Sequence, residues 1–193
     1  MRVAPVRNPA LIVVDVQRDF MPGGALPVPK GDEVVAPLNV LISHFAERGF
    51  TLIYTRDWHP PDHVSFRQRG GPWPPHCVQG SEGAEFHPDL VIPQGAVVVS
   101  KATDRDKDAY SGFGGTDLEK VLRDKGVRRL FVGGVATEYC VKSTVLDALR
   151  LGFEVFVVED AIRGIDPDGE EKAKIEMVKE GAVLIRLDEI LLG

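Results

Sequence analysis

Four residues able to take part in bond breaking end or follow apolar, strand-like segments of this chain. They carry a carboxylate, an ammonium or a thiol, and they are Asp15, Asp57, Lys101 and Cys140. Ligands bind to an open parallel sheet beyond the carboxyl ends of its strands, so four parallel strands would bring these side chains to one rim. A thiol beside a carboxylate and an ammonium predicts a hydrolase with a cysteine nucleophile.

The expected nucleophile is Cys140, although a lone cysteine after a strand is more often a small buried apolar residue. We interpret Thr137 as the N-cap of a helix over residues 138–150, which places Cys140 in the first turn. The partial positive charge of a helix start favours a thiolate, and a nearby Lys101 would favour it further. Backbone N–H groups of the same turn can bind an oxyanion, so this segment predicts an acyl-transfer site.

Asp15 is the expected proton acceptor for Cys140, and Lys101 is the cation expected to hold both groups. Taken singly, an aspartate at a strand end is more often a turn cap and a lysine there more often reaches solvent. Only their joint position favours catalysis. Asp160, which ends another strand-like segment, has no assigned chemical task, and we interpret it as a turn or helix cap.

A second group of side chains has the spacing of a metal site. Asp57 and His59 are two residues apart at a strand exit, where side chains two apart point the same way, so both can bind one ion. His76 is the expected third ligand, and three protein ligands leave positions open for water or substrate, as in catalytic sites. The alternatives are a closed structural zinc site that uses Cys77, or ordinary polar residues of a surface loop.

Residues 58–95 form a long connection rich in proline, and they contain four of the five histidines of the chain. Connections longer than about 12–15 residues in a compact domain are usually functional or disordered. The aromatic side chains in this segment can pack, which a disordered linker could not do. We therefore predict an ordered insertion after the second strand that binds a metal and acts as a lid.

The elements that must position these residues follow from the hydrophobic pattern. Apolar segments of strand length alternate with helical periodicity, which predicts an α/β fold with three α/β/α layers around a mostly parallel, Rossmann-like sheet of about six strands. Glycines of the left-handed helix-end type are expected after four helical stretches, at Gly49, Gly126, Gly152 and Gly181. A capping box over residues 116–119 and a cap at Asp168 are the predicted starts of two helices.

Length and composition indicate an ordinary enzyme of one domain, residues 1–193. The net charge is 23 − 29 = −6 without a basic run, which argues against nucleic acid or membrane partners and favours a small-molecule substrate. The apolar stretch before Asp15 is too short for a secretory signal or a membrane span, so we expect a cytoplasmic protein. The two cysteines are expected to be free thiols in a reducing compartment. A homo-oligomer is neither required nor excluded by the pattern.

Several motifs in order resemble nicotinamidases, also called pyrazinamidases, of the isochorismatase-like cysteine hydrolases. The resemblance extends from Asp15 to about Asp160. The matching segments are residues 15–20 (DVQRDF), 57–59 (DWH), 71–77 (GPWPPHC), Lys101, 110–113 (YSGF) and 134–141 (GVATEYCV).

The resemblance implies a role for each matching residue. The catalytic triad of the family falls on Asp15, Lys101 and Cys140. The metal ligands of the family fall on Asp57, His59 and His76. The matching histidine at His63 binds the ion in some relatives only, and we leave it out of the predicted ligand set.

The resemblance also implies the surroundings of the reacting carbon. A cis peptide is expected at Val135–Ala136, where it would direct the amides of Ala136 and Cys140 into an oxyanion hole. The positions that line the pyridine pocket of the family are Phe20, Trp73 and Tyr110.

The implied reaction is hydrolysis of nicotinamide, and of pyrazinamide, to the acid and ammonia through a cysteine thioester, in NAD salvage. The implied cofactor is a divalent metal ion, zinc in the first place and iron or manganese as alternatives, which would bind the ring nitrogen. Two alternatives stay open. One is the same cysteine hydrolase fold acting on another small amide or an isochorismate-like enol ether, and the other is a non-catalytic binding module stabilised by zinc.

Overall fold

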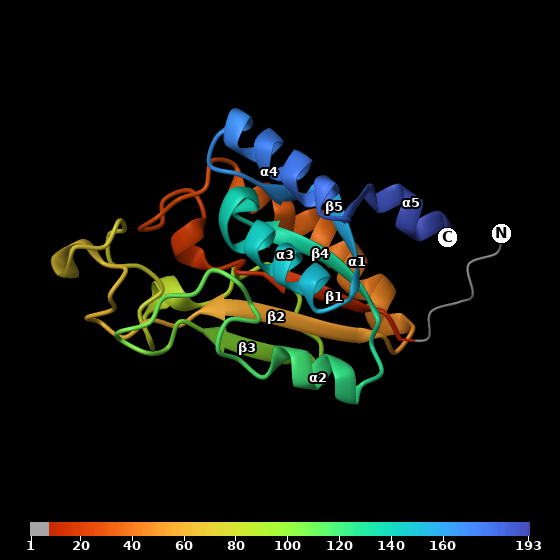
Figure 1. Ribbon diagram of the computed structural model, residues 1–193, viewed down its shortest axis with the longest axis horizontal. Helices are drawn as coiled ribbons and strands as arrows, with labels where there is room; N and C mark the ends of the chain where they lie inside the picture. Colours follow the sequence, from red (N-terminus) through yellow and green to blue (C-terminus); the bar gives the residue numbers. More distant parts are fainter. Residues whose placement is uncertain (1–7) are drawn as a thin grey trace.

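The computed structural model describes residues 8–193, and its centre is one sheet of six parallel strands (Figure 1). Every neighbouring pair is parallel, and the order across the sheet is β3-β2-β1-β4-β5-β6. The predicted α/β class, strand number and Rossmann-like arrangement are therefore confirmed. The strands are β1 Ala10–Val14, β2 Thr51–Asp57, β3 Val97–Lys101, β4 Arg129–Val135, β5 Glu154–Arg163 and β6 Val183–Ile185.

Helices cover both faces of the sheet and bury one apolar cluster on each. The cluster on one face includes residues of α1 and α5, and the cluster on the other includes residues of α2, α3 and α4. The three predicted layers are therefore present. The helices are α1 Val35–Glu47, α2 Leu118–Asp124, α3 Lys142–Arg150, α4 Pro167–Lys179 and α5 Leu187–Leu192. Short helical turns are η1 Arg18–Phe20, η2 Gly31–Val34, η3 Arg67–Arg69, η4 Glu82–Ala84 and η5 Thr137–Val141.

Burial explains why the central strand β1 consists of consecutive apolar residues. All five residues of β1, in the sequence ALIVV, are buried because helices cover both faces. The edge strands β3 and β6 contain exposed and half-buried positions instead. The apolar run of β1 is thus explained by burial on both faces, whereas the valines that begin β3 are half-buried or exposed at an edge.

The strand order reverses direction between β1 and β4. β1 pairs with β2 on one side and with β4 on the other, so the connections leave this point toward opposite edges. In open parallel sheets, the crevice at such a reversal, beyond the strand carboxyl ends, is where ligands bind. The fold itself therefore predicts a site beyond the ends of β1 and β4.

The ends of several helices can be compared with the predicted helix-end glycines and N-cap residues. Positive φ angles at Gly49, Gly126, Gly152 and Gly181 confirm all four helix-end glycines. The predicted cap at Asp168 was wrong by two residues. Asp166 is the N-cap of α4, where its carboxylate accepts the N–H of Gly169 at 2.7 Å and Pro167 follows as the first helical residue.

Two other predicted caps differ in detail. The capping box over residues 116–119 does not form, because Thr116 accepts the N–H of Leu118 at 3.2 Å instead of that of Glu119, and no side chain caps α2 from its N-cap residue Asp117. The Asp160 carboxylate accepts the N–H of Leu187 at 2.9 Å, so it does serve a helix start, but that of α5, which follows a different strand.

The insertion over residues 58–95 is ordered, as predicted. It extends beyond the carboxyl end of β2 at the left of Figure 1, and isolated bridges join His59 to Val78 and Phe66 to Trp73 within it. A third bridge joins Phe86 to Gln17, which follows β1. The insertion is therefore attached to the sheet at its carboxyl edge.

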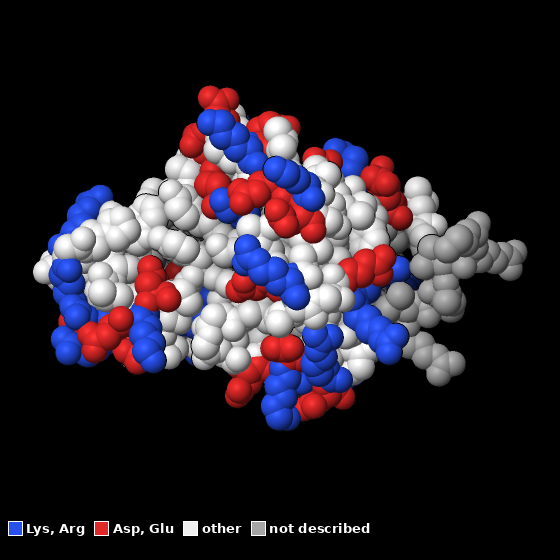
Figure 2. Space-filling view, in the orientation of Figure 1, with Lys and Arg blue, Asp and Glu red and all other residues white. Residues whose placement is uncertain are grey.

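Surface charge is mixed on the face drawn in Figure 2, where acidic and basic side chains alternate without a large patch of one sign. None of the helices in residues 8–193 has the length and apolar character needed to cross a membrane.

Candidate active site

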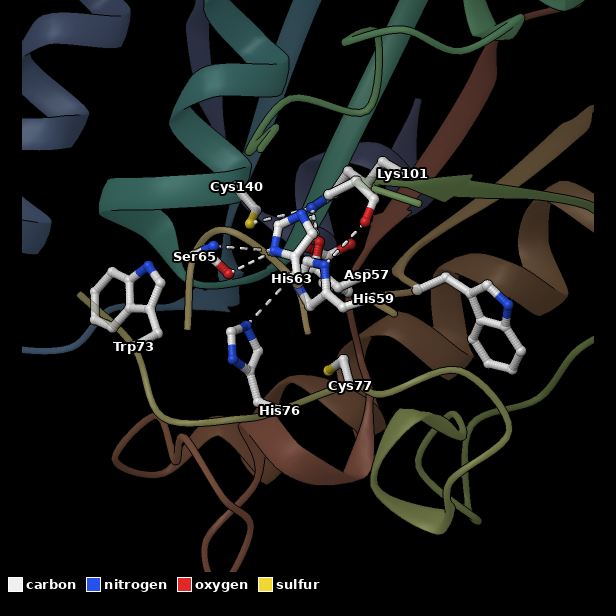
Figure 3. Close-up of polar contacts among 12 residues, drawn as sticks. Asp57, His59, His63, Ser65, Trp73, His76, Cys77, Lys101 and Cys140 are labelled. Carbon is white, nitrogen blue, oxygen red and sulfur yellow. Dashed lines mark hydrogen bonds and ion pairs between the residues drawn. The ribbon is translucent and has the colours of Figure 1, made fainter. Parts of the chain in front are cut away.

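A buried lysine joins the predicted catalytic residues into one cluster, and Figure 3 shows this lysine, Lys101, beside Cys140 and Asp57. The Lys101 Nζ atom lies 2.8 Å from Asp15 Oδ2 and donates to Cys140 Sγ at 3.4 Å. The reactive atoms of Asp15 and Cys140 lie within 4.8 Å of each other. The structure therefore brings the predicted triad together at the carboxyl ends of β1, β3 and β4.

The backbone holds Asp15 in an uncommon conformation. Its φ angle is +50°, and its side chain accepts the hydroxyl of Thr55 at 2.8 Å while its N–H donates to the carbonyl of Thr55 at 3.1 Å. Aspartate tolerates the left-handed region better than most residues. Two hydrogen bonds to β2 therefore aim the carboxylate at Lys101 instead of into a turn.

Burial and charge act in opposite directions on the protonation of the cluster. Burial lowers the pKa of Lys101, but the carboxylates of Asp15 and Asp57 outweigh it and raise this pKa well above its ordinary value. Burial also raises the pKa of Asp15, and Lys101 lowers it only in part. Lys101 therefore carries its charge, and Asp15 is a stronger base than an exposed aspartate.

The pKa of the Cys140 thiol shifts opposite to the direction that the helix start and Lys101 favour. Burial raises the pKa of Cys140 well above its ordinary value, and Lys101 lowers it only in part. Desolvation of a thiolate outweighs the helix start and the single cation, because Asp15 and Asp57 add negative charge nearby. The thiol therefore keeps its proton at rest, which makes a neighbouring proton acceptor necessary.

The segment that carries Cys140 also differs from the predicted helix. Its first turn, η5, is π-helical, and α3 follows it directly. Thr137 lies inside this turn instead of capping it, since the N-cap residue is Ala136 and no side-chain cap is formed. The peptide Val135–Ala136 is cis, as the resemblance implied. Ala136 and Cys140 both line the same pocket.

Three side chains form a group suited to a divalent metal ion. The donor atoms of Asp57, His59 and His76 lie within 4.8 Å of one another, and all three residues are buried. Asp57 Oδ2 is 3.4 Å from His59 Nε2 and 3.8 Å from His76 Nε2. One carboxylate and two imidazoles leave coordination positions open, which is the composition of a catalytic site.

Hydrogen bonds to backbone carbonyls orient both imidazoles. His59 Nδ1 donates to the carbonyl of Ala102 at 3.0 Å, and His76 Nδ1 donates to that of Pro74 at 2.8 Å. A carbonyl can only accept, so each ring carries a proton on Nδ1 and turns its other nitrogen, Nε2, toward Asp57. Such outer contacts fix metal-binding histidines in the tautomer that coordinates.

The pKa values of the two histidines shift in opposite directions. Burial lowers the pKa of His76, which favours the neutral form that binds metals. Burial also lowers the pKa of His59, but the hydrogen bond and charge of Asp57 outweigh it and raise this pKa. Burial raises the pKa of Asp57, but Lys101 and His59 outweigh it, so the carboxylate stays charged.

His63 and Cys77 do not belong to the group of three candidate metal ligands. Both nitrogens of His63 have protein partners, Nδ1 with the hydroxyl of Ser65 at 2.7 Å and Nε2 with the carbonyl of Lys107 at 2.9 Å. Its ring stacks on His59 at 4.2 Å between centroids. Cys77 is a buried free thiol outside both clusters of donor side chains found in residues 8–193. The closed zinc site that uses Cys77 is thus not supported.

Asp57 links the two groups, and this role was not predicted. It forms an ion pair with Lys101 through Oδ1 while Oδ2 faces the histidines. Gln17 holds the same strand end, because its side chain donates to the carbonyl of Asp57 and accepts the N–H of Asp57, both at 2.8 Å. A buried glutamine two residues after Asp15 was the available signal for this contact.

An apolar pocket opens beside Cys140. Phe20, Trp73 and Tyr110, the predicted substrate positions, all line it, together with His76 and Asp57. Trp73 Nε1 donates to the hydroxyl of Tyr110 at 3.1 Å, which connects two of these walls. Sequence reasoning missed four further lining residues, Leu26, Val28, Tyr139 and Ile165. These are apolar or aromatic side chains from separate segments, and only folding brings them together.

Comparison with known proteins places this geometry among amide hydrolases. Residues 9–189 match the family model described as the isochorismatase domain. The chain is 42% identical over 201 residues to a nicotinamidase of Escherichia coli, with 92% of this chain and 94% of that protein covered.

Solved structures of a pyrazinamidase and of the protein PnC1 are also similar to this chain. A pyrazinamidase of Pyrococcus horikoshii in complex with zinc is 57% identical, with a TM-score of 0.91 and coverage of 93% of this chain and 99% of that one. The protein PnC1 of L. infantum in complex with nicotinate is 38% identical, with a TM-score of 0.87 and coverage of 93% and 92%.

Proposed function

Because this chain belongs to the isochorismatase family, and because a thiol, a proton acceptor and three candidate metal ligands meet beside one apolar pocket, we propose that it hydrolyses nicotinamide to nicotinate and ammonia. The proposal includes the pyrazine analogue, which also presents a carboxamide beside a ring nitrogen. Similarity to the E. coli nicotinamidase and to the nicotinate complex of PnC1 supports the substrate. The corresponding physiological role is salvage of NAD in the cytoplasm.

One observation carries the proposal. Cys140, Asp57 and His76 border the same apolar pocket, and His59 lies with Asp57 and His76 in one group of donor atoms. Asp57 is also paired with the lysine that contacts Cys140. A flat heteroaromatic amide has two polar ends, its ring nitrogen and its carboxamide. The metal group and the nucleophile offer one partner for each end, while the pocket walls can cover the ring.

Thioester formation is the first half of the proposed mechanism. Asp15 takes the proton of Cys140, and the sulfur attacks the carboxamide carbon. The carbonyl oxygen becomes an oxyanion that accepts hydrogen bonds from the backbone N–H groups of Ala136 and Cys140. Asp15 returns the proton to the amide nitrogen, the C–N bond breaks, and ammonia leaves.

Hydrolysis of the thioester is the second half. Asp15 removes a proton from water, whose oxygen attacks the thioester carbon. The C–S bond breaks, the sulfur regains a proton from Asp15, and nicotinate is released. Lys101 stays protonated throughout and stabilises whichever neighbour is negative, a role that its raised pKa supports.

We propose that Asp57, His59 and His76 hold a divalent metal ion, with zinc favoured by the zinc complex of the P. horikoshii pyrazinamidase. When bound, the ion supplies a Lewis-acidic position for the ring nitrogen and so orients the ring. Phe20 and Trp73 present flat apolar faces to the pyridine, and Tyr110 is held by Trp73.

Ammonia release from nicotinamide by purified wild type and by Cys140→Ala tests the proposal. We expect kcat to fall by at least about 10³-fold in the variant, because no other group can form the thioester. Cys77→Ala is the matched control, since it makes the same change at a second buried thiol, and its activity should stay within a few-fold of wild type.

Each contrary result points to a different error. Activity that persists in Cys140→Ala would refute the covalent route. A wild type that releases no ammonia from nicotinamide, yet hydrolyses another small amide, would assign the same machinery to a different substrate.

A further inference from the structure

One wall of the pocket comes from the segment between β5 and α4. Ile165 lines the pocket and is 37% exposed. A partly exposed isoleucine at the edge of a ligand pocket has apolar surface that a bound ring can cover, and burying apolar surface favours binding. The position lies about 25 residues beyond Cys140 in the chain, outside every motif that supports the proposed function.

The backbone of this segment is held at consecutive positions. The N–H of Ile165 donates to Glu138 Oε1 at 2.8 Å, and the N–H of Gly164 donates to the carboxylate of Glu170. Asp166, the next residue, caps α4. Three acidic side chains therefore fix the chain on both sides of Ile165, so this wall is preorganised instead of mobile.

Glu138 connects the wall to the nucleophile. It lies in the turn η5, two residues before Cys140. A Cβ atom added at Gly164 or at Gly169 would lie 2.9 Å from Glu138 Oε2, so both glycines leave room for this carboxylate. The same Oε2 atom is buried and has no hydrogen-bond partner among the described residues. The contact with Ile165 thus accounts for the position of the Glu138 side chain.

We infer that Ile165 is a specificity-determining residue, and that Glu138 is the positioning residue that sets how close this wall comes to Cys140. The inference rests on the proposed function. The fixed wall limits the pocket to unsubstituted pyridine and pyrazine carboxamides, and it disfavours rings that carry an alkyl group on the side facing Ile165. Shortening the side chain opens space for such a group.

The test measures kcat/KM for nicotinamide and for a panel of nicotinamides with one methyl group on different ring carbons. In Ile165→Ala, the preference for nicotinamide over at least one methylated amide should fall by about tenfold or more. This ratio does not depend on how much of the protein is folded, because both substrates are compared on the same preparation.

Ile175→Ala is the matched control, since it makes the same truncation on α4 at a side chain that is 61% exposed. It should leave every ratio unchanged. Preferences that shift equally in both variants, or in neither, would overturn the inference for Ile165.

Two variants at Glu138 test the positioning role. Glu138→Ala removes the acceptor of the Ile165 N–H and should shift the same ratio in the same direction as Ile165→Ala. Glu138→Gln keeps a carbonyl oxygen that can accept this N–H and should restore the wild-type ratio. A loss of preference in Glu138→Gln equal to that in Glu138→Ala would show that charge, and not this hydrogen bond, is what matters, and would overturn the positioning role.

Failure of the proposed function looks different from failure of this inference. A wild type inactive on nicotinamide would overturn the function and the inference with it. An active wild type whose preference is unaffected by Ile165→Ala would leave the function intact and remove Ile165 from the determinants of specificity.

Discussion

The two halves of the site are built in different ways. The strand-end half consists of Asp15, Asp57, Lys101 and Cys140, whose backbones end or follow β1, β2, β3 and β4. Asp57 and Lys101 are direct partners in the parallel pairing of β2 and β3. The loop half consists of Phe20, Trp73, His76 and Tyr110, which lie on the connections between the strands, Phe20 in the short turn η1.

Different interactions hold the two halves. Buried charges and the ladder of the sheet position the strand-end half, whereas single contacts such as Trp73 to Tyr110 and His76 to the carbonyl of Pro74 position the loop half. A sheet position cannot shift without breaking many hydrogen bonds, but a loop contact can change alone. The sheet therefore positions the charged groups at the ends of β1, β2 and β3, the turn after β4 carries the nucleophile, and loops supply most of the pocket walls.

The largest effect is expected from the charge at the centre of the strand-end half. Lys101→Met leaves Asp15 and Asp57 buried without their cation, so the free energy of unfolding should fall by about 3–5 kcal/mol. Urea denaturation measures this change. Lys120→Met, which removes an exposed lysine paired with Asp124, is the control and should leave stability essentially unchanged. Similar values for the two variants would mean that the buried cluster is not what stabilises the strand ends.

Substitution of a glycine in β4 tests how closely the backbones of β1 and β4 approach each other. Gly134 has a φ angle of +125°, and a Cβ atom there would lie 2.2 Å from the carbonyl oxygen of Val14. Gly134→Ala should therefore lower the free energy of unfolding by about 3 kcal/mol. Gly152→Ala, where φ is +88° and the space is open, should lower it by only about 1 kcal/mol. Thermal melts would contradict this if both variants lost the same stability.

Zinc binding tests the contribution of His76, the candidate metal ligand in the loop half. Zinc at 100 times its dissociation constant should stabilise wild type by about 2.7 kcal/mol, an increment that a chelator removes. His76→Ala should lose most of this increment because it deletes a ligand from the insertion. His63→Ala should lower basal stability through its lost hydrogen bonds and keep the zinc increment. An increment lost in His63→Ala would make that histidine a ligand after all.

The smallest effect is expected at the helix that follows the mouth of the pocket. Asp166→Ala removes the side chain that caps α4 and should cost about 1 kcal/mol of unfolding free energy. Asp168→Ala, the position favoured by the sequence, should cost less than about 0.5 kcal/mol. If chemical denaturation showed a larger loss of stability in Asp168→Ala than in Asp166→Ala, Asp168 would be the capping residue.

The fold was predictable because its signals are local. The buried run of β1, the helical spacing in α1 and the glycines that end helices each reflect conformations of neighbouring residues. The caps were less predictable. Asp166 and Asp168 offer the same chemistry two residues apart, and Pro167 was the signal that distinguishes them.

Protonation in the site was not predictable from neighbouring residues. The sequence indicated a helix start and a lysine near Cys140, which both favour a thiolate. Burial and the carboxylates of Asp15 and Asp57, which reverse that expectation, come from distant parts of the chain. A pKa depends on every charge and on the solvent around a group, and the sequence contains no direct record of either.

The sequence by itself determined which residue types stand at the ends of which strands, and therefore that Asp15, Asp57, Lys101 and Cys140 would meet at one edge of the sheet. Local periodicity is sufficient for this, because parallel strands bring their carboxyl ends to one edge. Only the tertiary structure decided that Asp57 faces both groups, that both rings turn Nε2 toward it, and that Ile165 lines the pocket with its N–H bound to Glu138. These features depend on contacts between residues far apart in the chain, which form only when the strands and loops pack together.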